Sequence, residues 1–274
     1  MVNIHMCCLE SIRNRMIDNP RIKIFTRSMN QVLYHKAMAL CDLPYEKKRL
    51  LNTSADGYLY KVINDESADW AINIDEDAFV SNIDALKGLI QYCIENGYVN
   101  CGMPDGGVVH LRDGNPLVTN PYFNILNTKA IRQIIDIAKL DERPDSTQFN
   151  QRELLVGNYN FENVDEEPYY PFLIWTSNHF KTLYLKATNH PDGESTVLCD
   201  HHGTPFLIHT WYSRFYNRDR FHTRRIDKAF SEACNGQGRL YKEPWGDMLM
   251  CAYERTKHEL TAMGIRVKHL IIKK

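Results

Sequence analysis

Apolar and polar residues alternate along the first hundred positions in a pattern that predicts strands and helices in turn. Residues 21–28 (RIKIFTRS) and 47–57 (KKRLLNTSADG) are typical of short strands, and the segments 30–40 and 58–68 that follow them have helical spacing. The run WAINI at 70–74 is continuously apolar. A strand covered on both faces, as in a parallel sheet, has this character.

The clearest helix is predicted over 82–96, where apolar residues recur at helical spacing. We expect Ser81 and Asp84 to cap its start and Gly97 to end it. Residues 98–104 (YVNCGMP) then predict another strand. This alternation of strands and helices is typical of a doubly wound α/β sheet.

The order of elements is looser after residue 105. Residues 102–127 are dense in Gly, Pro, Asn and Asp, which predicts strands joined by tight turns. Further elements are expected as helices over 128–140 and 247–263, strands over 181–187 and 205–211, and loops over 216–225 and 235–246. No repeat or linker divides the chain, so we predict a single α/β domain over 1–274. Its central sheet is expected to be mostly parallel and flanked by helices, with a smaller mixed C-terminal part.

Charge and cysteine content narrow the class of protein. The 33 Lys and Arg against 34 Asp and Glu give a net charge of -1, which offers no support for nucleic-acid binding. None of the eight cysteines forms a C-x-x-C pair, so we expect free thiols in a reducing compartment. There is no signal-peptide pattern and no apolar run of the roughly 20 residues that cross a bilayer. We therefore expect a cytoplasmic protein. The segment RVKHLIIKK is expected to form a solvated last strand, with peripheral contact to an anionic membrane as the alternative.

Three acids, Asp75, Glu76 and Asp77, directly follow the apolar run at 70–74. If the strand continues through them, Asp75 and Asp77 lie on one face and Glu76 points away. Ligands bind at the carboxyl ends of the strands of open parallel sheets, and two carboxylates there repel each other unless a cation such as Mg²⁺ or Mn²⁺ lies between them. A D-x-D triplet arises about once by chance in a chain of this composition, so position gives it weight. Acids of a surface turn are the alternative reading.

This arrangement resembles the GT-A glycosyltransferases, which transfer a sugar from a nucleotide diphosphate donor. The resemblance rests on NIDED at 73–77 and on the order of elements from Arg21 to about Trp211. It implies a nucleotide-binding half over about 1–110 and an acceptor-binding half over about 111–274. By this resemblance Asp77 ligates a metal directly, and Asp75 holds the ribose or assists the metal.

The resemblance also implies a late histidine ligand, for which HHGTPFLIHTWYSR offers His201, His202 and His209. We favour His209 because it ends an apolar strand. An imidazole ligand favours Mn²⁺ over Mg²⁺. The alternative is a core histidine bonded to a backbone carbonyl.

A general base is expected just before the aromatic run that begins in NVDEEPYYPFLIW, at 163–175. The resemblance to inverting enzymes of this fold implies Glu167 as the base, with Glu166 as the second choice. Acids that only complement a helix dipole are the alternative, and a retaining enzyme requires no such base.

Contacts to the donor and acceptor follow from the same resemblance. The expected nucleotide contacts, beside Asp75 itself, are Thr26, Arg27, Asp56 and Lys61. Sugar contacts are expected from Tyr122 or Phe123 and from Asn120 or Asn124, and a diphosphate contact from Arg214 or Arg218.

The predicted function is metal-dependent transfer of a sugar, of the hexosyltransferase type, from a UDP- or GDP-sugar to the hydroxyl of a glycan or lipid-linked acceptor. Bacterial surface polysaccharide synthesis would suit such an enzyme. The processive Q-x-x-R-W signature is missing from the sequence, which argues against a polysaccharide synthase. Two alternatives remain, a nucleotidyltransferase or metal-dependent phosphohydrolase, and a non-catalytic carbohydrate-binding protein.

Overall fold

The computed structural model describes residues 20–54, 57–105, 115, 118–137, 140 and 167–272, with side chains described as far as residue 261. Its centre is a six-stranded sheet in the order β2-β1-β3-β6-β5-β7. The strands are β1 (Ile22–Arg27), β2 (Glu46–Leu50), β3 (Trp70–Ile74), β5 (Asn100–Gly102), β6 (Phe123–Leu126) and β7 (Thr182–Tyr184). Only β6 runs antiparallel to its neighbours, so the prediction of a mostly parallel central sheet is confirmed.

A second, antiparallel sheet has the order β4-β10-β9-β8. Its strands are β4 (Ala78–Val80), β8 (Ala187–Asn189), β9 (Thr196–Cys199) and β10 (Pro205–His209). Only residues 75–77 separate β3 of the central sheet from β4 of the second sheet. The acidic triplet is therefore the link between the two sheets.

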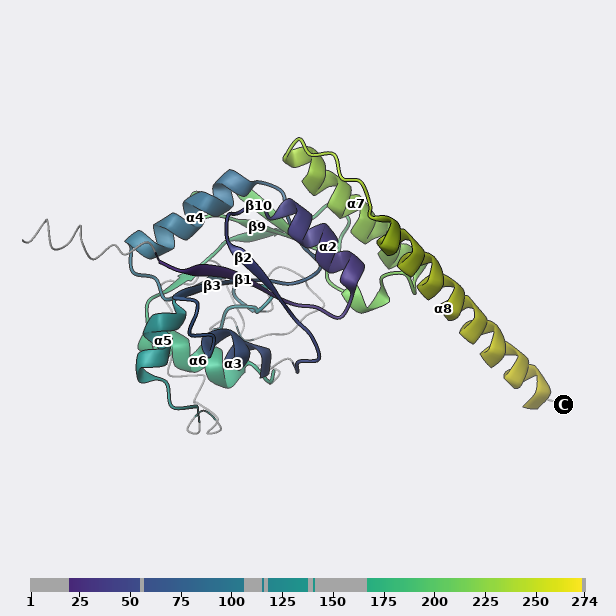
Figure 1. Cartoon of the computed structure of the whole chain (residues 1–274), viewed down its shortest axis with the longest axis horizontal. Helices are drawn as coiled ribbons and strands as arrows, with labels where there is room; N and C mark the ends of the chain where they lie inside the picture. Colours follow the sequence, from purple (N-terminus) through teal and green to yellow (C-terminus); the bar gives the residue numbers. More distant parts are fainter. Residues whose placement is uncertain are drawn as a thin grey trace, which may run out of the picture.

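Helices cover both faces of the central sheet (Figure 1). The helices among the described residues are α2 (Gln31–Leu40), α3 (Gly57–Ile63), α4 (Ile83–Glu95), α5 (Thr128–Ile134), α6 (Tyr170–His179), α7 (Arg220–Gly236) and α8 (Trp245–Ile272). Helices α3, α5 and α6 lie on one face, and α2, α4 and the second sheet lie on the other. A 3-10 turn, η3 (Ser213–Phe215), precedes α7.

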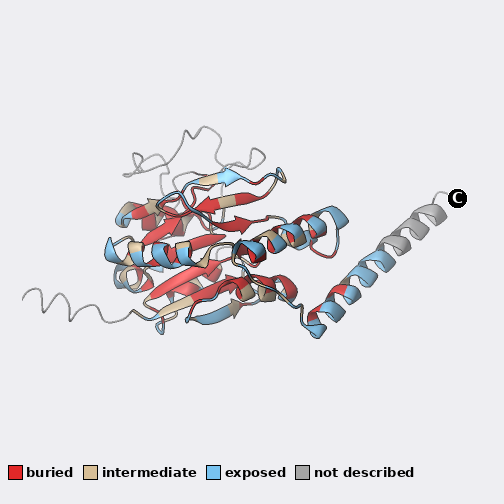
Figure 2. Cartoon of the chain, turned by 90° about the horizontal axis from the view of Figure 1, so that it is seen from above, coloured by how far each residue is buried: buried red, intermediate tan, exposed pale blue. Residues whose placement is uncertain are grey.

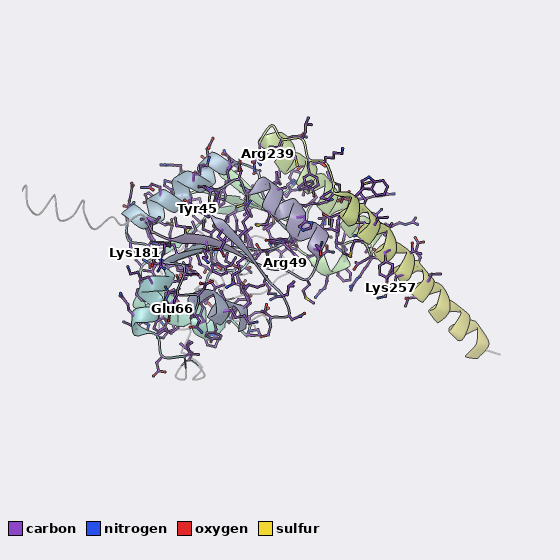
Figure 3. The ribbon with its side chains drawn as sticks, viewed as in Figure 1. Tyr45, Arg49, Glu66, Lys181, Arg239 and Lys257 are labelled. Carbon is purple, nitrogen blue, oxygen red and sulfur yellow. The ribbon has the colours of Figure 1, made fainter. Side chains whose placement is uncertain are left out.

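Helix α8 extends away from this body. Figure 2 shows its exposed surface projecting beyond the sheets, and Lys257 lies on the projecting part in Figure 3. No helix among the described residues is long and apolar enough to cross a membrane.

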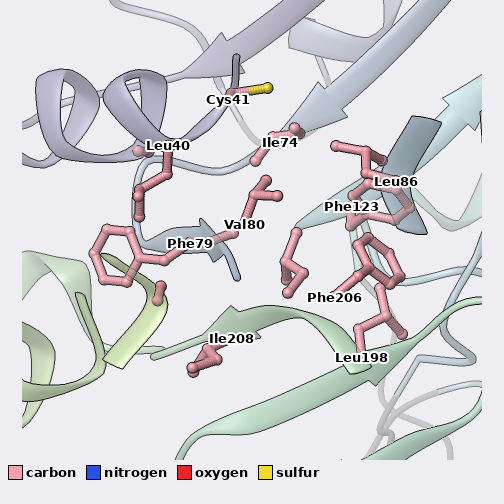
Figure 4. Close-up of a cluster of buried hydrophobic side chains, with 14 of the residues drawn as sticks. Leu40, Cys41, Ile74, Phe79, Val80, Leu86, Phe123, Leu198, Phe206 and Ile208 are labelled. Carbon is pink, nitrogen blue, oxygen red and sulfur yellow. The ribbon is translucent and has the colours of Figure 1, made fainter. Parts of the chain in front are cut away.

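Two apolar cores hold the layers together. The larger core lies between the central sheet, α2, α4, α7 and the second sheet, and Figure 4 shows part of it. Phe123 and Phe206 meet edge to face there, and Phe79 packs on Phe230 of α7. The smaller core packs α3, α5 and α6 against the other face of the sheet. Every cysteine among the described residues is a buried free thiol, as expected. The end of β3 is thus fixed between two packed layers.

Several local predictions are wrong in instructive ways. The N-cap of α4 is Asn82, whose side chain accepts from the Ala85 N–H at 3.1 Å, so Ser81 lies one residue before the cap. Helix α5 ends at Ile134 rather than at 140, since Ile134 and Ile137 find no core to pack against and stay exposed.

The C-terminal part is more helical than predicted. Most of 216–225 belongs to α7, whose buried apolar stripe begins only at Ile226, beyond the polar stretch that suggested a loop. The strand expected for RVKHLIIKK is wrong, because α8 continues through it to Ile272. The segment 181–187 is divided between β7 and the start of β8.

Candidate metal centre

The acidic triplet lies in a turn rather than in a continuing strand. The Ala78 N–H donates to the Asp75 carbonyl at 3.1 Å, which closes a tight turn directly after β3. The Asp75 N–H also donates to the carbonyl of Tyr122, which precedes β6, at 2.8 Å. The turn is therefore bonded to the residue before β6. Asp75 and Asp77 lie close together because of this turn, and not because of the strand alternation from which their proximity was predicted.

Strand pairing brings His209 to the same place. Residue His209 of β10 is in register with Ala78 of β4, so it lies beside Asp77. The Thr210 N–H and hydroxyl donate to the Asp77 carbonyl at 3.0 and 3.1 Å, and the His209 Nε2 lies 3.3 Å from Asp77 Oδ1. Ligand atoms of Asp75, Asp77 and His209 all lie within 4.8 Å of one another.

The charge state of Asp77 suits metal binding. Its side chain is buried, and burial by itself raises the pKa of a carboxyl. The adjacent His209 outweighs this effect, with help from Arg225, and holds the pKa of Asp77 below its ordinary value. These contacts favour the ionised form of Asp77, which is the form that binds a metal.

Aromatic side chains hold His209 in place. Its ring stacks on Tyr122 with centroids 4.0 Å apart, and Trp211 packs on it at 4.1 Å. Trp211 and Tyr212 have φ values of 56° and 60°, which is strained backbone for bulky residues. Arg225 donates to the Trp211 carbonyl at 3.2 Å and thereby supports this strained segment. Strain of this kind, held by surrounding contacts, is common at functional sites.

Glu76 has a structural role in the turn. Its Oε2 accepts from the Ser28 hydroxyl at 2.8 Å and from the backbone N–H groups of Met29 at 2.9 Å and Asn30 at 2.7 Å. Burial raises the pKa of Glu76, although these donors act in the opposite direction. The middle acid points away from the other two, as expected, and joins the loop between β1 and α2 to the turn.

Among the predicted nucleotide contacts, Arg27 lies near the centre. Its guanidinium is 5.7 Å from the ring centroid of Tyr58, whose pKa is raised by burial and by the charge of Asp75 and lowered by Arg27. Thr26 is fully buried with its hydroxyl toward Met38, so it faces the core rather than the strand end.

The other predicted residues are spread more widely. Lys61 is exposed on α3, and Asp56 and Glu166 lie outside the described residues. Glu167 is half-buried, and its carbonyl accepts from the Tyr170 N–H at the start of α6. The two histidines His201 and His202 lie on the turn before β10 and line a separate pocket of about 280 Å³.

The residues expected to contact a sugar are buried instead. Tyr122 packs against His209, and Phe123 lies in the larger core. Asn124 donates to the Thr119 hydroxyl at 2.8 Å, and the amide of Asn120 donates to Asp105. Of these four side chains, Tyr122 contacts the candidate metal centre, through the ring of His209.

Asp105, just after β5, was missed by the sequence reasoning. It is buried and also accepts from the hydroxyls of Tyr169 at 3.1 Å and Tyr170 at 2.7 Å. This carboxylate ties the start of α6, next to Glu167, to the edge of the central sheet. Its position directly after the strand predicted over 98–104 is the sequence feature that could have identified it.

Two solved structures resemble the chain distantly. A197 from STIV gives a TM-score of 0.37 and 14% identity over 68% of this chain and 93% of that protein. A glycosyltransferase involved in the glycosylation of the major capsid of PBCV-1 gives a TM-score of 0.29 and 12% identity, over 57% of this chain and 89% of that protein. No family model matches the sequence, and no curated protein matches it. A distant structural neighbour is thus a glycosyltransferase, and the chain carries an Asp-Asp-His cluster of its own.

Proposed function

We propose that the protein is a metal-dependent glycosyltransferase that moves a sugar from a nucleotide diphosphate donor, a UDP- or GDP-sugar, to an acceptor hydroxyl on a glycan or lipid. The observation that supports this proposal is the cluster of Asp75, Asp77 and His209 at the carboxyl end of β3, a central strand of the mostly parallel sheet. Open α/β sheets bind ligands at such edges.

The donor set fits a divalent cation. Two neighbouring ligands of an octahedral ion with metal–oxygen bonds of ~2.1 Å lie roughly 3 Å apart. The separation of 3.3 Å between His209 Nε2 and Asp77 Oδ1 is close to this value. Two carboxylates and an imidazole suit Mn²⁺ better than Mg²⁺, which prefers oxygen ligands alone.

Each residue then has a definite task. Asp75, Asp77 and His209 would hold the ion, which when bound supplies positive charge to stabilise the departing nucleotide diphosphate. Arg27, whose guanidinium lies over the ring of Tyr58, would contact the nucleotide. Glu167 would accept the proton of the acceptor hydroxyl, from its half-buried position before α6.

A thermal-shift screen tests this proposal. UDP, GDP, CMP and their sugars are each added with and without Mn²⁺, and unfolding is followed by fluorescence. We expect one diphosphate to raise the midpoint only when Mn²⁺ is present, because ligands that bind the folded state stabilise it by mass action.

Variants make the screen specific to the site. Asp75→Asn, at a half-buried position, should abolish the shift that requires both metal and nucleotide. Asp84→Asn, with a side chain 86% exposed on α4, is the matched control and should keep it. Nucleotide release from a nucleotide-sugar should follow the same pattern, and an unchanged Asp75→Asn protein would refute the proposal. Stabilisation by nucleoside triphosphates with release of pyrophosphate would instead identify a nucleotidyltransferase.

A further inference from the structure

Helix α8 is attached to the body along one side only. The buried carboxylate of Asp247 lies 2.7 Å from His35 Nδ1 on α2. Further along, the buried Cys251 sulfur accepts from the Asn217 amide at 3.2 Å, and Arg255 donates to the Asn217 side-chain oxygen at 3.0 Å. These contacts fix the direction in which the helix leaves the domain (Figure 1).

The other side of α8 is apolar and exposed. Counted from Trp245, large apolar residues follow after three, four, eight and fifteen positions, which places them on one face of a helix. We call this face the α8 stripe; it consists of Trp245 (75% exposed), Met248 (48%), Leu249 (61%), Tyr253 (63%) and Leu260 (59%). A row of exposed apolar side chains is unusual on a protein surface and marks a site of interaction.

The charge of the adjoining sequence indicates what the stripe contacts. Residues 260–274 (LTAMGIRVKHLIIKK) contain four basic residues, Arg266, Lys268, Lys273 and Lys274, and no acid. Two copies of the chain paired in parallel along this helix would bring like charges together. A surface of anionic lipids attracts the same charges and accepts apolar side chains beside them.

A groove between α7 and α8 adds basic groups next to the helix. It has a volume of about 900 Å³. Four arginines, one histidine and three acids line it, namely Arg218, Arg220, Arg224, Arg255, His258, Asp219, Asp227 and Glu259. The N-cap role of Asp219 and the ion pair of Asp227 with Lys36 occupy two of these acids. The third acid, Glu259, lies 3.6 Å from Arg220, and Arg255 is bound to Asn217. Arg218 and Arg224 are then the arginines of the groove that would meet lipid phosphates.

We propose that the α8 stripe binds to the surface of an anionic membrane. The helix would lie in the plane of the interface, with Trp245, Leu249 and Tyr253 among the acyl chains, and the anionic headgroups would attract the positive charge carried by the sequence from residue 260 on. This proposal is independent of the sugar-transfer chemistry, since the residues of the stripe belong to no part of the metal centre.

Flotation of the full protein with vesicles tests the proposal. Phosphatidylcholine vesicles are compared with vesicles in which about one third of the lipid is phosphatidylglycerol. We expect the protein to float with the anionic vesicles only, and to be released as salt screens the charges. Leu249→Glu should weaken this binding by about tenfold or more, because an apolar side chain that would enter the membrane is replaced by a charge.

Thr261→Glu is the matched control. It adds the same charge to the same helix at an exposed position away from the stripe, so the electrostatic change is equal. We expect it to weaken binding much less than Leu249→Glu. Equal weakening by the two variants would refute insertion of the stripe.

Trp245 provides a readout of insertion that does not depend on a variant that could unfold. Its fluorescence should shift to the blue when anionic vesicles are added, and Trp245→Phe should remove that shift. Light scattering in the same buffer checks for self-association. Failure to bind anionic vesicles, or a dimer that Leu249→Glu dissociates, would overturn the proposal, the second result identifying another copy as the partner.

Discussion

Replacing Glu76 by alanine removes a carboxylate of which one oxygen, Oε2, accepts three hydrogen bonds. The three donor groups do not lose the same free energy when this acceptor is removed. The Ser28 hydroxyl keeps a second acceptor, the Asn30 carbonyl at 3.1 Å, and Met29 is 84% exposed, so water can reach its N–H. The Asn30 N–H loses a bond of 2.7 Å at a half-buried position, which costs about 1–3 kcal/mol.

Asn30 is also the N-cap of α2, with its side chain bound to the N–H groups of Val32 and Leu33. Disturbing a cap costs about 1 kcal/mol. We therefore expect Glu76→Ala to lower the free energy of unfolding by about 2–4 kcal/mol. Glu76→Gln keeps one acceptor oxygen and should cost about 1 kcal/mol or less.

Urea unfolding followed by circular dichroism measures both effects. Glu46→Ala is the control, since its side chain is 61% exposed on β2 in a surface ion pair worth less than about 1 kcal/mol. A loss below about 1 kcal/mol in Glu76→Ala would refute the assigned role. If Glu76→Gln stayed stable and yet lost the shift caused by metal and nucleotide, Glu76 would belong to the metal centre instead.

Three further perturbations test other parts of the fold. Gly102→Ala should destabilise the protein by about 1–3 kcal/mol, because a Cβ there would lie 2.8 Å from a backbone oxygen of β6. Gly88→Ala, on the exposed face of α4, meets nothing within 4 Å and should stabilise the protein by about 0.5–1 kcal/mol. Thermal unfolding measures both changes. The hydrogen bonds from Arg21 lower the pKa of Asp69 to about 2 from 3.8, so its stabilising contribution is complete above the unfolded pKa and is lost as pH falls toward 2. Asp69→Asn should flatten that loss in acid unfolding, and an unchanged pH profile would contradict it. Arg225→Lys cannot hold the strained aromatic segment in the same way and should weaken Mn²⁺ affinity by about tenfold, measured by metal titration, with unfolding midpoints reported beside it.

Local patterns predicted the first half of the fold well. Most strands and helices up to residue 104 form near the positions that the apolar spacing predicts, since each buries its own apolar face. The short strand β4 was not predicted, and β2 ends at Leu50 instead of continuing to 57. The errors occur where spacing and burial disagree. Ile134 and Ile137 have helical spacing but no core to enter, and the polar start of α7 hides a stripe that begins at Ile226.

The candidate metal centre combines ligands that are close in the sequence with one that is distant. The sequence explains only why the two close ligands lie together. Asp75 and Asp77 are two residues apart, so any compact turn after β3 keeps them together. His209 joins them through the pairing of β10 with β4, across more than a hundred residues of chain. Its place at the end of an apolar strand indicated a sheet edge but not which partner strand. Arg225 carried no such signal, because its role depends on the backbone of Trp211, whose strained conformation exists only in the folded protein. The ligands of such a centre can thus be found from strand ends, whereas the residues that hold them rigid emerge only from the tertiary contacts.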